Sequence, residues 1–280
     1  YKEFMTGLLH WSDVDFADHI GALVVHSANH NTGTCMPCHN WAESIREWYY
    51  LTGDPRPLEM LNKMATWLLS DDTRRFFKMD PQPYVRGCGW GLIQLAAIQE
   101  VLDRDDLKSL ILKIASDLLD YFQKHDGLVM KIAEGGTQVA KDNAFHSATV
   151  VMGAERCYRL LGDDMLKELA LSVSEVFMDR RACSPEGIAV YISAPEQSFP
   201  MQQAAAFAMA ALATAYRLDP QERFVRRGMR MLEYCLDRGM IVDHMRIPGE
   251  FIEQDGNLIL SPRLTMPNTQ LSSYQLRGLL

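Results

Sequence analysis

The chain has 280 residues, of which 48% are hydrophobic and 23% are charged, a composition typical of globular proteins with one large domain or two ordinary ones. Its formal net charge of −8 argues against a nucleic acid partner, because phosphate binding requires a basic surface. Apolar segments such as residues 204–215 are shorter than the roughly 20 residues that cross a membrane, so we expect no membrane partner.

The two ends of the chain suggest a piece of a longer protein. The sequence begins at Tyr1 without a signal peptide, and residues 275–280 look like the middle of a helix. We therefore expect residues 1–280 to form a single domain excised from a longer multidomain protein. The localisation stays open between a bacterial cytoplasm and secretion.

Histidines and acids dominate the beginning of the chain, where five of the eight histidines lie within the first 39 residues. Asp13, Asp15 and Asp18 are either acids of a solvated helix start or a polar wall that lines a site or binds a hard cation. His26 and His30 are four residues apart, but the residues after His30 (NTG) indicate a loop. This density predicts that at least two histidines face a common cleft.

Residues 35–39 (CMPCH) have the spacing of a covalent haem site, in which two thiols hold the macrocycle and the histidine ligates the iron. The match opens a long helix inside a repeat array and contains a proline, which argues against haem. A zinc site is the second interpretation, with candidate ligands His26, His30, Cys35, Cys38 and His39. Their spacing matches no closed zinc module, so we predict no metal or cofactor, with a divalent cation as the alternative.

His39 and Glu43 are four residues apart, which predicts that they share one face of a helix. Cys35 or Cys38 beside His39 also allows a thiolate–imidazole pair, although no motif of a serine or cysteine triad accompanies it. The structural interpretation of both cysteines is buried packing in the loop before the helix.

Four short junctions between helices repeat at intervals of about 50 to 60 residues, which indicates a repeat architecture. They lie at residues 49–54, 101–106, 159–164 and 216–220. Gly53 and Gly162 suit the left-handed conformation that ends a helix, and an aspartate then caps the next helix. The helices before the last three junctions, expected at residues 87–102, 145–161 and 201–218, are apolar all round, as in an inner ring.

The sequence RGCGWG at residues 86–91 places a cation, Arg86, and an indole, Trp90, at the start of the helix expected at residues 87–102. No GxxxxGK[ST] motif is present, which excludes a phosphate-binding loop. Arg86 suits a carboxylate ligand, to which a guanidinium donates two parallel hydrogen bonds, whereas Trp90 either stacks on a sugar or packs in the core. His146 holds a corresponding place at the next inner helix.

These hairpins predict an all-α fold, an α/α toroid that corresponds to an incomplete six-hairpin barrel. An α-solenoid has the same local pattern and is the alternative. Residues 187–192 and 240–247 are expected to form short strands at the mouth of the ring, where loops carry the binding groove.

The order of the N-terminal motifs resembles the α/α-toroid domain of the exo-rhamnogalacturonan lyase-like family. The matching segments are residues 10–15 (HWSDVD), 26–30 (HSANH) and 39–43 (HNWAE), followed by 48–54 (WYYLTGD). Ser44 replaces a glycine of the family pattern, and Cys35 and Cys38 stand where the family has no fixed cysteines. The specific resemblance covers about the first 100 residues, and family members carry β-domains before the toroid.

The resemblance implies a polysaccharide lyase that cleaves a pectin-like polysaccharide or oligosaccharide beside a uronic acid by β-elimination. It implies His30 or His39 as base or acid, with Glu43 orienting a histidine. It further implies that Arg86 binds the uronate carboxylate. The other predicted substrate-binding residues are Trp41, Trp90, Asp13, Asp15, His26 and His146.

Two other functions remain open on the same scaffold. A glycoside hydrolase would use a pair of carboxylates, such as Asp13 or Asp15 with Glu43. A non-catalytic helical-repeat module would bind a glycan or a protein, and would leave the clustered histidines unexplained.

Overall fold

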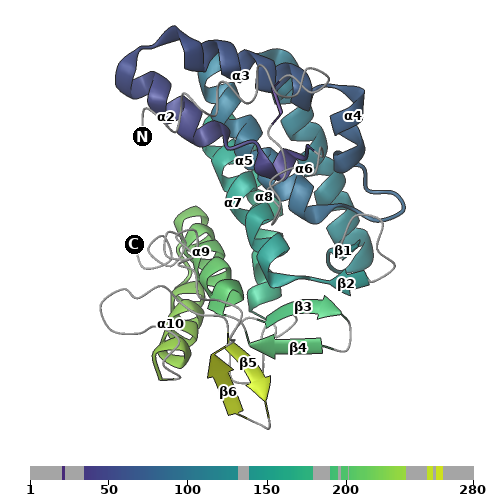
Figure 1. The fold of residues 1–280 in the computed structure, drawn as a ribbon. Coiled ribbons are helices and arrows are strands. Elements are labelled where there is room, and N and C mark those ends of the chain that lie inside the picture. Colours follow the sequence, from purple (N-terminus) through teal and green to yellow (C-terminus); the bar gives the residue numbers. More distant parts are fainter. Residues whose placement is uncertain are drawn as a thin grey trace.

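The computed structural model describes residues 21–22, 35–131, 139–178, 190–194, 197–200, 202–237, 251–254 and 257–260 (Figure 1). Within these residues the longer helices are α2 (Ala42–Thr52), α3 (Pro55–Leu68), α5 (Val85–Leu102), α6 (Asp105–His125), α7 (Ala144–Leu161), α8 (Asp164–Ser174), α9 (Gln202–Leu218) and α10 (Glu222–Asp237). Shorter turns of helix are η2 (Pro37–His39), α4 (Asp71–Arg74), η3 (Arg75–Phe77) and η4 (Glu175–Phe177). The fold is the predicted array of helical hairpins.

The junctions between paired helices have the predicted chemistry. Gly53 is left-handed, with φ of 64°, and the Asp54 side chain accepts the backbone N–H of Arg56 at the start of α3. Gly162, with φ of 70°, and Asp163 repeat this arrangement between α7 and α8. Glycine adopts this conformation without the steric cost of a side chain, and the aspartate satisfies an amide that has no partner within the helix.

The junction between α5 and α6 reaches the same turn with different residues. Asp103 takes the left-handed position, with φ of 46°, where no glycine is present. The Gln99 side chain, in place of an aspartate, accepts the backbone N–H of Arg104 at 3.1 Å. A short polar side chain tolerates the left-handed conformation better than an apolar one, which explains how this junction forms without glycine.

The helices form two layers. Helices α2, α5, α7 and α9 follow one another along the inner layer, and α3, α6, α8 and α10 cover them as partners in the hairpins (Figure 1). In α5 every residue from Gly87 to Gln99 is buried, whereas α6 buries one stripe that includes Leu107, Ile111, Ile114 and Leu118. This burial confirms the expectation that α5 and α7 lie in the inner layer.

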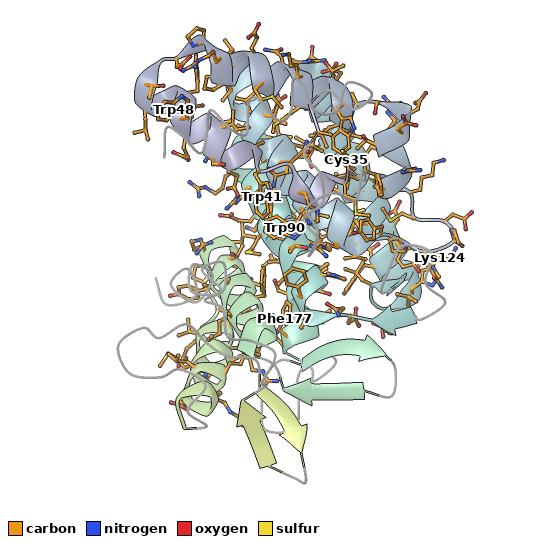
Figure 2. All side chains as sticks on the ribbon, viewed as in Figure 1. Cys35, Trp41, Trp48, Trp90, Lys124 and Phe177 are labelled. Atoms are coloured by element: carbon orange, nitrogen blue, oxygen red, sulfur yellow. The ribbon has the colours of Figure 1, made fainter. Side chains whose placement is uncertain are left out.

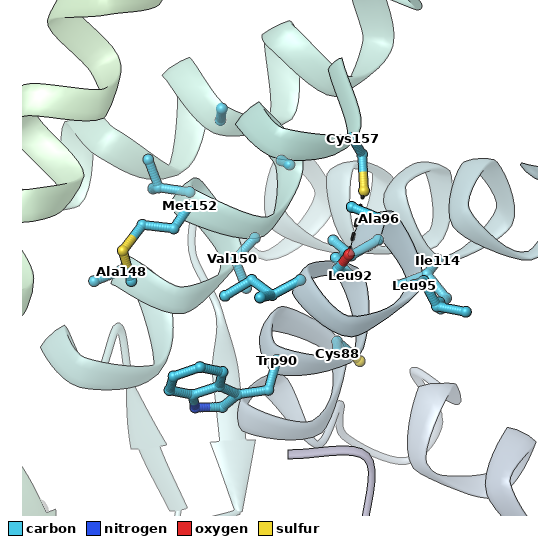
Figure 3. Packing of buried hydrophobic residues seen from close by; sticks show 14 of the residues in the cluster. Cys88, Trp90, Leu92, Leu95, Ala96, Ile114, Ala148, Val150, Met152 and Cys157 are labelled. Atoms are coloured by element: carbon cyan, nitrogen blue, oxygen red, sulfur yellow. Dashed lines mark hydrogen bonds between the residues drawn. The ribbon is translucent and has the colours of Figure 1, made fainter. Parts of the chain in front are cut away.

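Helices α5 and α7 approach each other closely because glycines face the contact. A Cβ on Gly153 would lie 2.7 Å from the Gly89 carbonyl oxygen, and one on Gly89 would lie 2.3 Å from Thr149 Oγ1. Across the same contact the Cys157 thiol donates to the Leu92 carbonyl at 3.4 Å (Figure 3). The contact therefore fixes the spacing of the two central inner helices.

Short antiparallel hairpins occur where the chain passes from an outer helix to the next inner helix, and again after α10. They pair β1 (Val129–Lys131) with β2 (Val139–Lys141), β3 (Val190–Ala194) with β4 (Gln197–Pro200), and β5 (Phe251–Gln254) with β6 (Asn257–Leu260). Neighbouring hairpins touch, through β2 with β3 and β4 with β5. They gather near the end of the ring at which inner helices α7 and α9 begin, which we call the mouth (Figure 1).

Of the two expected strands, residues 187–192 overlap β3, and residues 240–247 lie outside the described residues. The other strands were not predicted, because segments of three or four residues carry too little alternation to be recognised. No helix in the described part of the chain is both long enough and apolar enough to cross a membrane.

Candidate functional site

Three separate segments bring predicted side chains to the mouth. His39 ends η2, and Trp41 stands immediately before α2. Arg86 and Trp90 lie one turn apart at the start of α5, and His146 lies in the first turn of α7. The backbone N–H of His146 is held at 3.1 Å by the side chain of the N-cap residue Asn143. These segments are far apart in sequence, and the inner layer brings their ends together.

The two indoles form the centre of this cluster. The rings of Trp41 and Trp90 meet edge to face, with centroids 5.9 Å apart (Figure 2). The His39 ring stands 6.5 Å from Trp41 at right angles. Trp90 is only 3% exposed, whereas Trp41 is half-buried. Trp90 therefore belongs to the core, and Trp41 is the more accessible ring of the pair.

Trp41 has an unusual backbone for a bulky residue, with φ of 49° and ψ of 36°. A left-handed residue other than glycine costs about 1–2 kcal/mol, so neighbouring bonds must hold it. The Gln94 side chain accepts the N–H of Ala42 at 2.6 Å, and the Ser44 hydroxyl donates to the Trp41 carbonyl at 3.0 Å. Strain of this kind gathers at functional sites, where it fixes a side chain in an otherwise unfavourable position.

Arg86 is a cation without a carboxylate partner among the described residues. Its guanidinium carbon lies 5.8 Å from the centre of the Phe145 ring. Its Nε atom is buried and has no hydrogen-bond partner. A buried donor left unpaired is costly, so this arrangement favours a ligand that supplies an acceptor.

His146 lies beside this cation and is 4% exposed. Burial lowers the pKa of His146 from its ordinary value of 6.5 to about 3, and the charge of Arg86 lowers it in the same direction. The imidazole is therefore neutral near pH 7, and the positive charge of this part of the mouth belongs to Arg86.

The expectation that His39 and Glu43 share one helix face is wrong. The left-handed Trp41 separates η2 from α2, so His39 lies before the helix that contains Glu43. The Glu43 carboxylate instead forms an ion pair with Arg156 of α7. It does not contact His39 in this arrangement, and the orienting role finds no support.

Glu43 belongs to a second depression, which we call the rear groove. The groove has a volume of about 620 Å³, and it is lined mainly by Glu43, Arg46, Glu47, Ile93, Glu100, Arg156 and Arg159. Arg46 and Glu100 also form an ion pair, with a nitrogen–oxygen distance of 2.7 Å. Most of these charges are paired with one another. Arg86 at the mouth has no carboxylate partner among the described residues.

Several predicted residues cannot be placed. Asp13, Asp15, His26 and His30 lie outside the described residues. Cys35 and Cys38 are buried thiols that form no disulfide, and their burial agrees with the structural interpretation. No group of three or more histidine, cysteine or acidic side chains in the described segments is arranged to hold a metal ion. The cluster that includes His26 and His30 stays untested.

Gln94 and Arg156 were not predicted as parts of the site. Gln94 follows Trp90 by one helical turn, has apolar neighbours on both sides in the sequence, and is fully buried. A buried amide among apolar residues was therefore a usable signal. Arg156 carried no such signal, because its partner Glu43 lies 113 residues away in the sequence.

No family model matches the chain, and no curated protein matches it. Among solved structures the chain is similar to cellobiose 2-epimerase from Bacillus thermoamylovorans, with a TM-score of 0.59 and 13% identity over 84% of this chain and 69% of the other. It is also similar to an unsaturated glucuronyl hydrolase from Streptococcus agalactiae, with a TM-score of 0.61 and 13% identity over 99% and 72%. A polysaccharide lyase has a TM-score of 0.62 and 10% identity over 99% and 83%. The fold that this chain shares with these carbohydrate-active enzymes is the α/α toroid.

Proposed function

We propose that this chain is the toroid domain of a carbohydrate-active enzyme that cleaves a glycan containing uronic acid, of the pectin or rhamnogalacturonan kind, by β-elimination. The observation that carries the proposal is Arg86, whose buried Nε has no acceptor among the described residues. A carboxylate accepts from a guanidinium through two parallel hydrogen bonds, which a neutral sugar does not do.

The reaction assigns a task to each part of the mouth. A base removes the proton from the ring carbon that bears the carboxylate, and the bond to the leaving glycosidic oxygen breaks as a carbon–carbon double bond forms. An acid protonates the leaving oxygen. Arg86 neutralises the carboxylate, whose negative charge grows as the proton leaves. His30 or His39 supplies the base or the acid, and Trp41 supports the sugar ring.

Two further observations support the proposal. The left-handed Trp41 is held by Gln94 and Ser44, so the half-buried indole has a fixed position for a sugar. The fold neighbours include proteins named as a polysaccharide lyase and as unsaturated glucuronyl hydrolases. Both kinds of protein process glycans on this scaffold.

A glycoside hydrolase is the second candidate, because unsaturated glucuronyl hydrolases occur more than once among the fold neighbours. Hydrolysis in most families needs two free carboxylates across the scissile bond. Glu43 is bonded to Arg156 in the rear groove, which argues against its use in such a pair. The other candidates, Asp13 and Asp15, lie outside the described residues.

The role of Arg86 can be tested by calorimetry with two matched oligosaccharides, one of galacturonate and one of galactose. We expect the galacturonate ligand to bind more tightly, and Arg86→Gln to weaken its binding about 10- to 100-fold, since a charge-assisted hydrogen bond contributes about 1.5–3 kcal/mol. The galactose ligand should be affected much less.

Arg159→Gln is the matched control, because it removes one positive charge as Arg86→Gln does. The Arg159 side chain lies in the rear groove and is 74% exposed. It should bind the galacturonate ligand as the wild type does. Equal affinity of wild type and Arg86→Gln for this ligand would refute the assignment.

A further inference from the structure

The start of α2 depends on a side chain from another helix. Trp41 occupies the N-cap position, and its side chain makes no capping hydrogen bond. A local cap requires a side-chain oxygen, which an indole lacks. The first amide of α2, that of Ala42, is fully buried and donates instead to Oε1 of Gln94 in α5 at 2.6 Å. Gln94 therefore satisfies this amide across the contact between the two inner helices.

Helix α5 contains a second glutamine with a similar task, which provides a comparison. Oε1 of Gln99 accepts the N–H of Arg104, just before α6, at 3.1 Å, and its Nε2 donates to Asp103 at 3.4 Å. Nε2 of Gln94, in contrast, is buried and has no hydrogen-bond partner among the described residues. An unpaired buried donor is costly, and an apolar residue of similar size would avoid this cost. Stability alone therefore gives little reason for a glutamine at position 94.

The bond to Ala42 connects the segment that holds Trp41 with the helix that holds Arg86. Arg86, Trp90 and Gln94 follow one another at intervals of four residues, so they lie along the same side of α5. At a rise of 1.5 Å per residue, Arg86 and Gln94 are about 12 Å apart along the helix axis. Gln94 thus fixes the backbone beside Trp41 relative to the side of α5 that holds the cation.

We propose that Gln94 is a positioning residue that determines specificity, because it fixes the spacing between the Trp41 indole and the Arg86 guanidinium. A uronate stacked on Trp41 then reaches Arg86 with its carboxylate, without any rearrangement of the indole, and such preorganisation increases affinity. A neutral sugar gains only the stacking. This inference rests on the proposed uronate substrate, and Gln94 itself does not touch the sugar.

The position of Trp41 can be measured without a ligand. Two indoles whose centroids lie 5.9 Å apart couple in circular dichroism and give a paired positive and negative band, which Trp41→Phe should abolish. Gln94→Met keeps the size of the side chain but removes the acceptor, so the band should decrease toward that of Trp41→Phe. Gln94→Glu keeps an oxygen that accepts the amide, and burial favours its neutral carboxyl, so it should retain the band. An unchanged band in Gln94→Met would overturn the proposal.

Gln99→Met is the matched control, because it removes the same kind of hydrogen bond near the other end of α5. It should lower the free energy of unfolding and leave the band unchanged. An equal loss of the band in Gln99→Met and Gln94→Met would indicate general loosening of the helix and overturn the proposal. Gln94→Asn is a second disruptive variant should Gln94→Met not fold, since its amide is one methylene too short to reach Ala42.

The effect on specificity is measured by calorimetry with oligosaccharides of galacturonate and of galactose. We expect the preference of the wild type for galacturonate to fall about 3- to 10-fold in Gln94→Met, the coupling usual for residues in one network. Gln94→Glu should restore the preference, and Gln99→Met should keep it. Arg86→Gln should also cost less affinity in the Gln94→Met background than in the wild type. Equal costs would show that Gln94 does not set the position of the platform relative to Arg86, and would overturn the proposal.

The two readouts separate this inference from the proposed function. A chain that binds neither oligosaccharide would refute the function, while the dichroism of the Gln94 variants would still decide whether Gln94 positions Trp41. A preference for galacturonate that is the same in the wild type and in Gln94→Met would support the function and overturn the specificity role of Gln94.

Discussion

Arg86 and His146 illustrate at the level of single residues how burial affects charge at the mouth. Both lie near the starts of inner helices, and burial keeps His146 neutral beside the cation. The sequence predicted Arg86, His39 and Trp41 as site residues because charged or aromatic side chains at the ends of apolar helices are easily recognised. It did not reveal that Glu43 turns away from His39, because a single left-handed residue, Trp41, breaks the helix between them.

The burial of His146 predicts a pH dependence of stability. The folded chain keeps this imidazole neutral down to a pKa of about 3, whereas the unfolded chain protonates it near 6.5. Between these values the unfolded state binds more protons, so the free energy of unfolding falls as the pH is lowered from about 6.5 toward 3. Urea unfolding of the wild type and His146→Gln across this range measures the contribution.

In His146→Gln this part of the decline should disappear, even where the substitution lowers stability at every pH. Equal slopes of stability against pH in the two proteins would show that His146 titrates normally in the folded state.

His39 provides the prediction for turnover. Replacement by glutamine keeps a polar side chain but removes the imidazole, so His39→Gln should reduce turnover at least about 100-fold if the ring takes part in proton transfer or charge stabilisation. Circular dichroism should show unchanged helicity. His125→Gln is the control, because this exposed histidine ends the outer helix α6. Full activity of His39→Gln would remove His39 from the mechanism.

At the scale of elements, the contact of α5 with α7 positions the mouth, because Arg86 and Trp90 belong to one helix and His146 to the other. Gly153→Ala would place a methyl group 2.7 Å from a backbone oxygen that cannot move independently. We expect a loss of about 1–3 kcal/mol in the free energy of unfolding, as for other overpacked contacts.

Gly228→Ala is the matched control in α10, since a Cβ there meets nothing within 4 Å. It should leave stability unchanged or raise it by up to about 1 kcal/mol, because alanine favours the helix. Denaturant unfolding compares the two, and equal effects would contradict the close contact between α5 and α7.

The elements also show which features a sequence can predict. The inner helices at residues 87–102, 145–161 and 201–218 begin within two residues of the observed starts and end at the observed residues. Glycine and aspartate at their ends act locally, so a short segment contains the information. The ion pair of Glu43 with Arg156 joins segments that only the complete ring brings together, and no local pattern marks it.

At the scale of the whole molecule, the ring has two differently charged regions. The rear groove holds arginines and glutamates that pair with one another, whereas the mouth holds Arg86 without a carboxylate partner among the described residues. An anionic glycan would therefore be drawn to the mouth rather than to the rear groove. The proposed uronate-containing substrate depends on this difference.

The most direct test of the account is to incubate the chain with rhamnogalacturonan and follow the ultraviolet absorbance of an unsaturated uronide, with reducing ends measured in parallel. The account predicts a rise in absorbance that His39→Gln and Arg86→Gln suppress and that Arg159→Gln leaves unchanged. Release of reducing ends without absorbance would contradict β-elimination and establish the hydrolase. No change in either signal would contradict an enzyme of this class and favour a module that only binds glycan.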